Sequence, residues 1–385
     1  MKEERGEAMR LSKLTKSLDY TLLGVVGLIL VMSFFILQSA TVNASARFHI
    51  NFVYRQMVWA IVGLVAFFCV LIIDYSKVAK YSKLIYALNL LLLLATLFLG
   101  EETKGAQAWI ELGPVKFQPA EVVKTLLILG LAQFLVPRVG KLNTFKELFP
   151  VFIYVAIPLL LILKQPDLGT GLVYVAIMLG MLLAAGASPR LLFLLVGGSI
   201  GLIALAIYGH FTWDWWLPLE NYQINRLIIF IDPMIDPRGA GWNIIQSQIA
   251  VGSGGLWGKG WGMGSQNIND FLPEQWTDFI FCVLAEEFGF IGSAILLLLF
   301  FYLIYRGIMI AREAKDTYGA LIAIGVVSMF SFHILQNIGM SIGIMPITGI
   351  PLPFVSYGGS SLLANMIALG LLMNVYIYND DRLMF

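Results

Sequence analysis

The sequence predicts an all-α polytopic membrane protein with about ten transmembrane helices and a long outer loop between helices seven and eight. Three observations lead to this fold class. Of the 385 residues, 59% are hydrophobic and only 13% are charged, whereas roughly a quarter of the residues in a soluble domain are charged. The mean hydropathy is +0.82. Apolar runs close to the length of about 20 residues that crosses a bilayer recur along the whole chain.

The apolar runs divide the chain into candidate helices. We expect these helices at residues 20–40, 56–73, 84–100, 119–136, 148–164, 171–187, 191–210, 278–305, 319–343 and 361–379. Residues 1–19 then form a cytoplasmic N-terminal segment, residues 20–379 one transmembrane domain, and residues 380–385 a cytoplasmic tail. The charged first segment runs into the first apolar stretch without an A-x-A cleavage site, which predicts a retained helix and not a cleaved signal peptide.

Lysine and arginine residues predict the orientation. With the N-terminus inside, sixteen of them lie in inner segments and eight in outer segments, the asymmetry that the positive-inside rule describes. We therefore expect both termini in the cytoplasm and the loop at residues 211–276 outside. A connection of that length is typically functional. The balanced net charge of +1 and the lack of a basic run give no indication of nucleic-acid binding.

Charged residues enter the membrane at the start of the fourth helix. Pro119 suits the first helical position, where its missing N–H would have no partner. Glu121 and Lys124 are three residues apart and share one helix face. Intramembrane charges usually pair with each other, line a wet cavity or mark a functional site. A structural ion pair and a substrate contact therefore both remain open.

Three other outer or intramembrane positions carry polar groups. Asp167 lies in the turn before helix six, where it either caps the helix or faces a ligand. His333 lies beside amide side chains in helix nine, which is typical of hydrogen bonding between membrane helices. Residues 346–361 hold three prolines and then Ser356 and Ser360, which predicts a rigid, hydroxyl-rich turn at the floor of an outer cavity.

The long loop ends in the most informative stretch. Seven glycines fall within residues 252–264 and allow tight backbone turns. They do not form a P-loop, because Ser253 and Gly260 stand where that motif needs glycine and then serine or threonine. Asp278 follows at the expected start of helix eight, where an acid can cap the helix. A carboxylate at the outer membrane surface can equally be catalytic, and these residues alone do not separate the two interpretations.

Five motifs occur in a fixed order: Gln-Pro-Ala-Glu-Val-Val-Lys at 118–124, Gln-Pro-Asp-Leu-Gly-Thr-Gly at 165–171, the Gln-to-Gly run at 246–260, Leu-Pro-Glu-Gln-Trp-Thr-Asp-Phe-Ile-Phe at 272–281, and Thr-Gly-Ile-Pro-Leu-Pro-Phe-Val-Ser-Tyr-Gly-Gly-Ser-Ser at 348–361. As a set they resemble the SEDS family, the polytopic peptidoglycan glycosyltransferases of bacterial elongation, division and sporulation. Residues 239–246 and 285–289 are similar to the RodA-like elongation members. Trp276 and Ala108 depart from the family pattern, which usually has histidine and often arginine at these positions.

The resemblance implies polymerisation of lipid II at the outer face of the bacterial cytoplasmic membrane during elongation and rod-shape maintenance. Asp278 is then the catalytic general base for the acceptor hydroxyl. The residues that the resemblance makes candidates for substrate binding are Lys124, Glu121, Arg226, Arg55, Asp167, Ser356 and Ser360. The cofactor stays undetermined: a divalent cation is compatible with pyrophosphate chemistry, but the sequence shows no cluster of metal ligands.

The implied partners are lipid II, a class B penicillin-binding protein that acts as transpeptidase, and other membrane proteins of the elongation complex. Two other functional classes compete with this prediction. A flippase for the lipid-linked precursor needs polar groups that are reachable from both faces in turn, and here these groups concentrate at the outer rim. A purely structural scaffold would not need Asp278 or Lys124.

Overall fold

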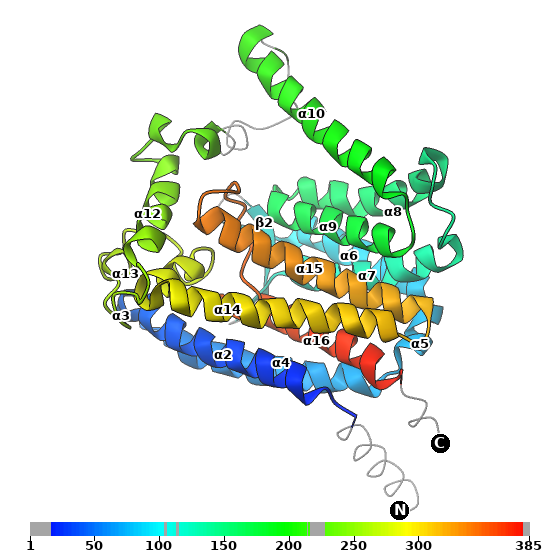
Figure 1. Ribbon diagram of the computed structural model, residues 1–385, viewed down its shortest axis with the longest axis horizontal. Coiled ribbons are helices and arrows are strands. Elements are labelled where there is room, and N and C mark those ends of the chain that lie inside the picture. The colour runs from blue at the N-terminus through cyan, green and yellow to red at the C-terminus, as the bar shows by residue number, and fades with distance from the viewer. Residues whose placement is uncertain (1–16, 104–105, 113–114, 214, 216–227, 380–385) are drawn as a thin grey trace, which may run out of the picture.

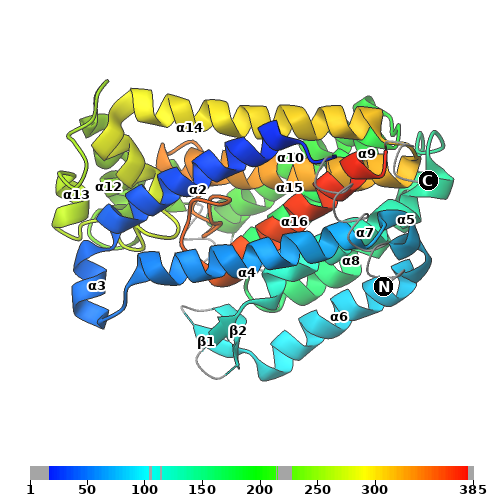
Figure 2. The ribbon, with the colours of Figure 1, turned by 90° about the horizontal axis from the view of Figure 1, so that it is seen from below.

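The computed structural model describes residues 17–103, 106–112, 115–213, 215 and 228–379. In these residues long helices lie side by side in a bundle, and the shorter helices α3 (Val42–Phe48), α12 (Ala240–Ser253) and α13 (Ser265–Ile268) gather at one end (Figures 1 and 2). We call the end that carries α12 and α13 the outer end, following the orientation that the charges predict. The chain's expected tail at residues 380–385 and most of residues 1–19 lie outside the described residues.

Among the described residues, ten long helices make up the bundle, and each expected apolar segment falls in one of them. Their bounds are α2 (Tyr20–Ala40), α4 (Phe52–Ile72), α6 (Ser82–Leu99), α7 (Pro119–Leu135), α8 (Phe145–Leu163), α9 (Leu168–Ala184), α10 (Pro189–Trp213), α14 (Ile280–Glu313), α15 (Thr317–Ser341) and α16 (Gly359–Ile377). Within the described residues, nine helical stretches are long and apolar enough to cross a membrane. The remaining helix, α9, is apolar but has only 17 residues.

Short elements connect the long helices. They are α3 (Val42–Phe48), α5 (Tyr75–Val78), η1 (Ala79–Tyr81), η2 (Val136–Arg138), η3 (Pro233–Ile235), α12 (Ala240–Ser253) and α13 (Ser265–Ile268). The connection between α6 and α7, expected only as an outer loop, contains a small antiparallel sheet. Its strands are β1 (Glu101–Thr103), β2 (Ala106–Leu112) and β3 (Val115–Phe117), in the order β1-β2-β3.

Helices α7, α15 and α16 form the centre of the bundle, as Figure 2 shows for α16 between α4 and α15. In the most apolar window of α16, 83% of the residues are buried, whereas only 6% are buried in α10. Figure 1 shows α10 leaning away from the other helices. The helices that carry the intramembrane charges of the sequence therefore lie where neighbouring helices, and not lipid, surround them.

Helix α14 is two helices joined at a glycine. Gly289 adopts φ 64° and ψ −160°, a conformation that essentially only glycine tolerates. The part after the break, residues 290–313, is long enough to span a membrane by itself at 1.5 Å per residue. The part before it is buried on every side: all residues from Ile280 to Glu287 lie inside the protein. The helix expected to be continuous over residues 278–305 is therefore interrupted, and its first part is a separate short buried helix.

The glycine-rich segment, residues 254–264, satisfies the backbone groups that the break exposes. Lys259 and Gly260 donate their N–H groups to the carbonyls of residues 286 and 287, both at 3.0 Å. In return, the N–H groups of residues 290 and 291 bond to the carbonyls of Gly255 and Leu256 at 2.9 and 3.1 Å. Such close backbone approach needs glycine, because a Cβ atom at Gly258 would lie 2.2 Å from a carbonyl oxygen of α14.

Alanine in place of Gly289 should destabilise the outer end. The new Cβ atom would lie 2.3 Å from the backbone nitrogen of Gly258, and backbone strain alone costs about 1–3 kcal/mol. We expect a lower thermal unfolding midpoint for Gly289→Ala in detergent. The matched control is Gly252→Ala at the end of α12, where the Cβ atom has open space. Equal midpoints for the two variants would contradict this account of the glycine-rich segment.

Candidate active site

Asp278 lies in a turn before α14 and not in the helix. The carbonyl of Glu274 accepts the N–H groups of Thr277, Asp278 and Phe279 at 3.1, 3.1 and 3.3 Å, which closes the turn. The N-cap position of α14 belongs to Phe279, and no side chain caps it. The structure thus provides no capping role for the half-buried Asp278 side chain.

The loop between α15 and α16 holds this turn in place. Asn337 on α15 donates from Nδ2 to the carbonyls of Asp278 and Ile350, at 2.9 and 2.8 Å. Ser356 donates its hydroxyl to the carbonyl of Thr277 at 2.6 Å. Because three elements distant in sequence meet at these bonds, the backbone of Asp278 is fixed from two sides.

Trp276 takes part in the same junction by packing. Its ring lies 5.7 Å from that of Phe52 on α4, which also contacts Tyr357 at 5.0 Å. The carbonyl of Trp276 accepts the N–H of Tyr357 at 2.9 Å. An indole is a hydrogen-bond donor only and has no basic nitrogen that could take up a proton, so this position contributes packing and backbone contacts.

A buried ion pair occupies the outer part of α7. Lys124 Nζ lies 2.9 Å from Glu121 Oε1, and the two side chains are only 2% and 4% exposed. On the other side, Lys124 Nζ lies 3.2 Å from Nε2 of His333 on α15. The expected pairing of Glu121 with Lys124 is therefore present, and the histidine bonds between helices as expected, with lysine as its partner.

A cavity of about 40 Å³ lies beside this pair. Its lining comes from α7, α9, α15 and the loop that follows α15: Gln118, Glu121, Lys124, Asp167, Thr170, Val173, His333, Gly349, Ile350 and Pro351. Asp167 caps α9, with Oδ1 and Oδ2 accepting from the backbone and hydroxyl of Thr170 at 2.9 and 2.8 Å. Asp167 therefore caps α9 and also lines the cavity. Two carboxylates face the cavity for one ammonium group.

Gly349 joins the cavity to Asp278. It lines the cavity, it has φ 71°, and a Cβ atom at this position would lie 3.5 Å from Oδ2 of Asp278. Gly349 therefore lies close to the carboxylate of Asp278 and lines the same cavity as Lys124.

Several buried polar atoms of this region have no hydrogen-bond partner among the described residues. They are Glu121 Oε2, His333 Nδ1 and Thr348 Oγ1. Buried polar groups in folded proteins are nearly always paired, so such a group is a natural contact for a polar ligand or for ordered water.

Three other described residues that were predicted to bind substrate, Ser356, Ser360 and Arg55, lie outside the cavity lining. Ser360 accepts the N–H of Gln118 at 3.0 Å and so ties α16 to the start of α7. Ser356 also bonds to backbone groups. Arg55 lies beside the phenol of Tyr357: burial raises the pKa of Tyr357, and the nearby guanidinium opposes that shift. Neither serine nor Arg55 lines the cavity. Arg226 lies outside the described residues.

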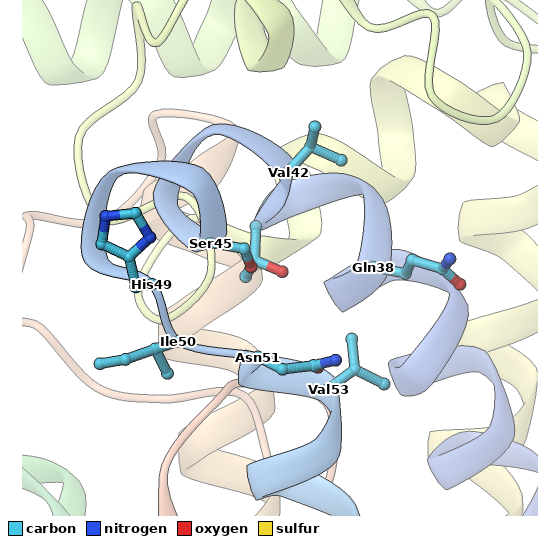
Figure 3. Close-up of a pocket in the computed structure, with 8 residues that line it drawn as sticks. Gln38, Val42, Ser45, His49, Ile50, Asn51 and Val53 are labelled. Atoms are coloured by element: carbon cyan, nitrogen blue, oxygen red, sulfur yellow. The ribbon is translucent and has the colours of Figure 1, made fainter.

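Figure 3 shows a pocket of about 350 Å³ between α3 and the adjoining ends of α2 and α4. His49 is its one ionisable lining residue, so it offers no acid and cation in combination. Among the described residues, no group of three or more His, Cys, Asp or Glu side chains is placed to hold a metal ion.

The two glutamates after Asp278 have structural partners. Glu286 Oε1 accepts from Lys259 at 2.6 Å and from the hydroxyl of Ser265 at 3.0 Å. Glu287 Oε1 accepts from Asn267 at 3.1 Å and also from the hydroxyl of Ser39. These bonds attach α13 and the glycine-rich segment to the buried part of α14.

Comparison with known proteins places the chain among cell-wall proteins. A family model described as cell cycle protein and covering FtsW, RodA and SpoVE matches residues 18–381. Stage V sporulation protein E of Bacillus subtilis is 39% identical, with 93% of this chain and 95% of that protein covered. Peptidoglycan glycosyltransferase MrdB of Escherichia coli K12 is 38% identical, with 94% of each chain covered.

Solved structures share the fold. A chain from a structure described as coordinating polymerization and crosslinking in a peptidoglycan synthase complex superposes with a TM-score of 0.78, at 31% identity. The alignment covers 94% of this chain and 99% of that one. The rod shape determining protein RodA of Thermus thermophilus gives a TM-score of 0.67 at 30% identity, covering 93% of this chain and 96% of that one.

Removing one member of the buried pair should cost more stability than removing both. Lys124→Met leaves a buried carboxylate without a counter-charge, and Glu121→Gln leaves a buried ammonium; breaking such a pair costs about 3–5 kcal/mol. The double variant should unfold close to the parent temperature, because neither charge remains. Thermal unfolding of all four proteins in one detergent measures this coupling. Additive losses would mean that the two residues act independently.

Proposed function

The chain belongs to the family of FtsW, RodA and SpoVE, the SEDS proteins that its motifs resemble, and we propose that it is a peptidoglycan glycosyltransferase that polymerises lipid II during cell elongation. Relatives named as peptidoglycan glycosyltransferases MrdB and RodA are 38% and 36% identical over most of the chain. The single observation that supports the site is the proximity of Asp278 to Gly349, which lines the same cavity as Lys124.

The proposed reaction is one displacement at the sugar. Asp278 takes the proton of the acceptor 4-hydroxyl while that oxygen bonds to the anomeric carbon of the donor. The bond from this carbon to the pyrophosphate oxygen breaks, and undecaprenyl pyrophosphate leaves with the electron pair. A single displacement inverts the anomeric centre, which turns an α-linked donor into a β-linked glycan. Because pyrophosphate is a good leaving group, the lipid itself supplies the energy.

The cavity lining by itself carries too little positive charge to stabilise a leaving pyrophosphate. Glu121 and Asp167 outnumber Lys124, and a neutral His333 adds no positive charge. A developing pyrophosphate needs positive charge nearby. Arg55, beside Tyr357, and Arg226 are the outer arginines proposed to supply it. A divalent cation that arrives with the phosphates is a further candidate, since Mg²⁺ often binds through one or two carboxylates plus substrate phosphates.

The bonding of Glu286 and Glu287 argues against the flippase alternative. A transport path needs polar groups that become reachable from each face. Both of these side chains are 1% exposed, and they bond to Lys259 and Asn267 in the outer segments that they anchor. The carboxylates at or near the cavity, those of Glu121, Asp167 and Asp278, all belong to the site proposed for the transferase.

Asp278→Asn should abolish polymerisation while leaving the fold intact. The amide has nearly the same shape, and the contacts that Asn337 and Glu274 make with residue 278 use its backbone. Loss of a positioned general base costs about 10²–10⁴-fold in rate. The measurement is glycan chain formation by the purified protein from labelled lipid II, with the unfolding temperature recorded in parallel.

The matched control for this variant is Glu274→Gln in the same turn. The carbonyl of Glu274 closes the turn, and its carboxylate accepts from the hydroxyl of Thr277 at 3.1 Å. This variant should polymerise like the parent protein. Full activity of Asp278→Asn, or an equal loss in Glu274→Gln, would remove the case for Asp278 as the base.

A class B penicillin-binding protein should accelerate the reaction. A structural relative is described as part of a complex that coordinates polymerization and crosslinking, and this sequence has no transpeptidase motif of its own. We expect weak turnover by the isolated protein and a substantially higher rate in the complex, through contacts to lipid-exposed helix faces and the 211–276 loop. The glycine-rich part of that loop is already bound to α14, so the effect should arise elsewhere in it.

Lipid II turnover measured against partner concentration tests this dependence. A partner whose transpeptidase serine has been acylated by penicillin serves as control, because it retains the contacts without cross-linking. A rate that stays flat up to saturation with the cognate partner would show that the coupling is spatial only.

A further inference from the structure

Lys124 is held from two sides by groups on different helices. Glu121 Oε1 on α7 lies 2.9 Å from its Nζ, and His333 Nε2 on α15 lies 3.2 Å from it. His333 is 1% exposed, and it lines the same cavity as the lysine. A single histidine in an apolar helix therefore provides the link between α15 and the one cation of the cavity lining.

The chemistry of the two groups decides which atom donates. An ammonium group has three N–H donors and no acceptor, and the neighbouring carboxylate of Glu121 favours the charged form of Lys124. The ring nitrogen that faces it must then be the unprotonated acceptor. It follows that His333 is a neutral imidazole whose proton is on Nδ1, the nitrogen that has no partner among the described residues.

The number of N–H donors on Lys124 also shows where its third N–H group points. Two of its three N–H groups point to Glu121 and His333, and the third has no acceptor in the described part of the chain. Fixing two of the three directions of a tetrahedral group fixes the third. Since the cavity adjoins all three side chains, this third N–H is the donor available to a ligand there.

We propose that His333 is a positioning residue: it accepts a hydrogen bond from Lys124 and, with Glu121, aims the remaining N–H of that lysine at the substrate. The identity of the substrate in this inference rests on the proposed function, whereas the contact between His333 and Lys124 does not. A carboxylate at position 333 would be a poorer choice, because it would add a third negative charge beside one cation. Glutamine supplies a neutral acceptor at a similar reach, whereas leucine supplies none.

The first experiment tests the contact without any turnover. The chain has three histidines, so His49→Asn and His210→Gln together leave His333 alone; asparagine suits the positive φ of residue 49. Nitrogen-15 NMR of the histidine-labelled full-length protein should show one protonated and one unprotonated ring nitrogen, with the proton on Nδ1. Lys124→Met should release the ring to exchange between both tautomers. A ring protonated on Nε2, or on both nitrogens, overturns the proposal.

The second experiment separates positioning from bulk structure. At equal amounts of folded, monodisperse protein, His333→Leu should lower kcat/KM for lipid II by roughly 10- to 100-fold, the effect of losing a hydrogen bond to a charged group. His333→Gln should stay close to the parent. Ser328→Ala is the control, since it also removes a side-chain hydrogen bond from α15, the partly buried bond of Ser328 to the carbonyl of Ile324.

The outcomes distinguish this inference from the proposed function. If the parent polymerises lipid II and His333→Leu does so equally well, or if His333→Gln is as poor as His333→Leu, positioning by His333 is wrong while the transferase assignment stands. If the parent does not polymerise lipid II under any condition with its partner, the proposed function fails. In that case the tautomer of His333 still decides whether it holds Lys124.

Discussion

The ammonium group of Lys124, buried inside a membrane bundle, constrains everything around it. A charge in such a place is tolerated only when it is paired and hydrogen-bonded. Glu121 supplies the counter-charge from the same face of α7, and His333 supplies a neutral acceptor from α15. The central position of α7 among α9, α15 and α16 follows from the same need, because a lipid-facing helix could not offer these partners.

The outer end obeys a parallel rule for the backbone. Irregular chain near a membrane requires that every N–H and carbonyl find a partner in the protein. The break at Gly289 frees such groups on α14, and the glycine-rich segment pairs with them through four backbone hydrogen bonds. Glu286 and Glu287 then attach the neighbouring helix α13 to the same place. The glycines of this segment either approach α14 closely, as at Gly254, Gly258 and Gly264, or have a positive φ, as at residues 255, 260 and 262, and neither feature requires a bound nucleotide.

Sequence patterns predicted the parts of this fold that depend on local order. Each expected apolar run is a helix, because about 20 apolar residues have few other stable arrangements in a membrane. The pairing of Glu121 with Lys124 could also be predicted from the sequence, because the two residues are three positions apart on one helix. The contact of Lys124 with His333 could not be predicted in this way, since the two residues are 209 positions apart in the sequence. The break of α14 was also missed: glycine within an apolar helix is common, and only the partner segment shows that Gly289 has a non-helical conformation.

The placement of Asp278 outside the helix has a chemical consequence. A carboxylate at a helix N-cap gives its lone pairs to backbone N–H groups, which stabilises the anion and makes it a weaker base. Here a carbonyl, that of Glu274, accepts the local N–H groups, and the loop after α15 fixes the backbone through Asn337. These backbone hydrogen bonds hold the turn at residue 278. Lys124, which lines the cavity beside Gly349, is held by Glu121 and His333, so in the proposed reaction the base and the cation are both positioned before the substrate arrives.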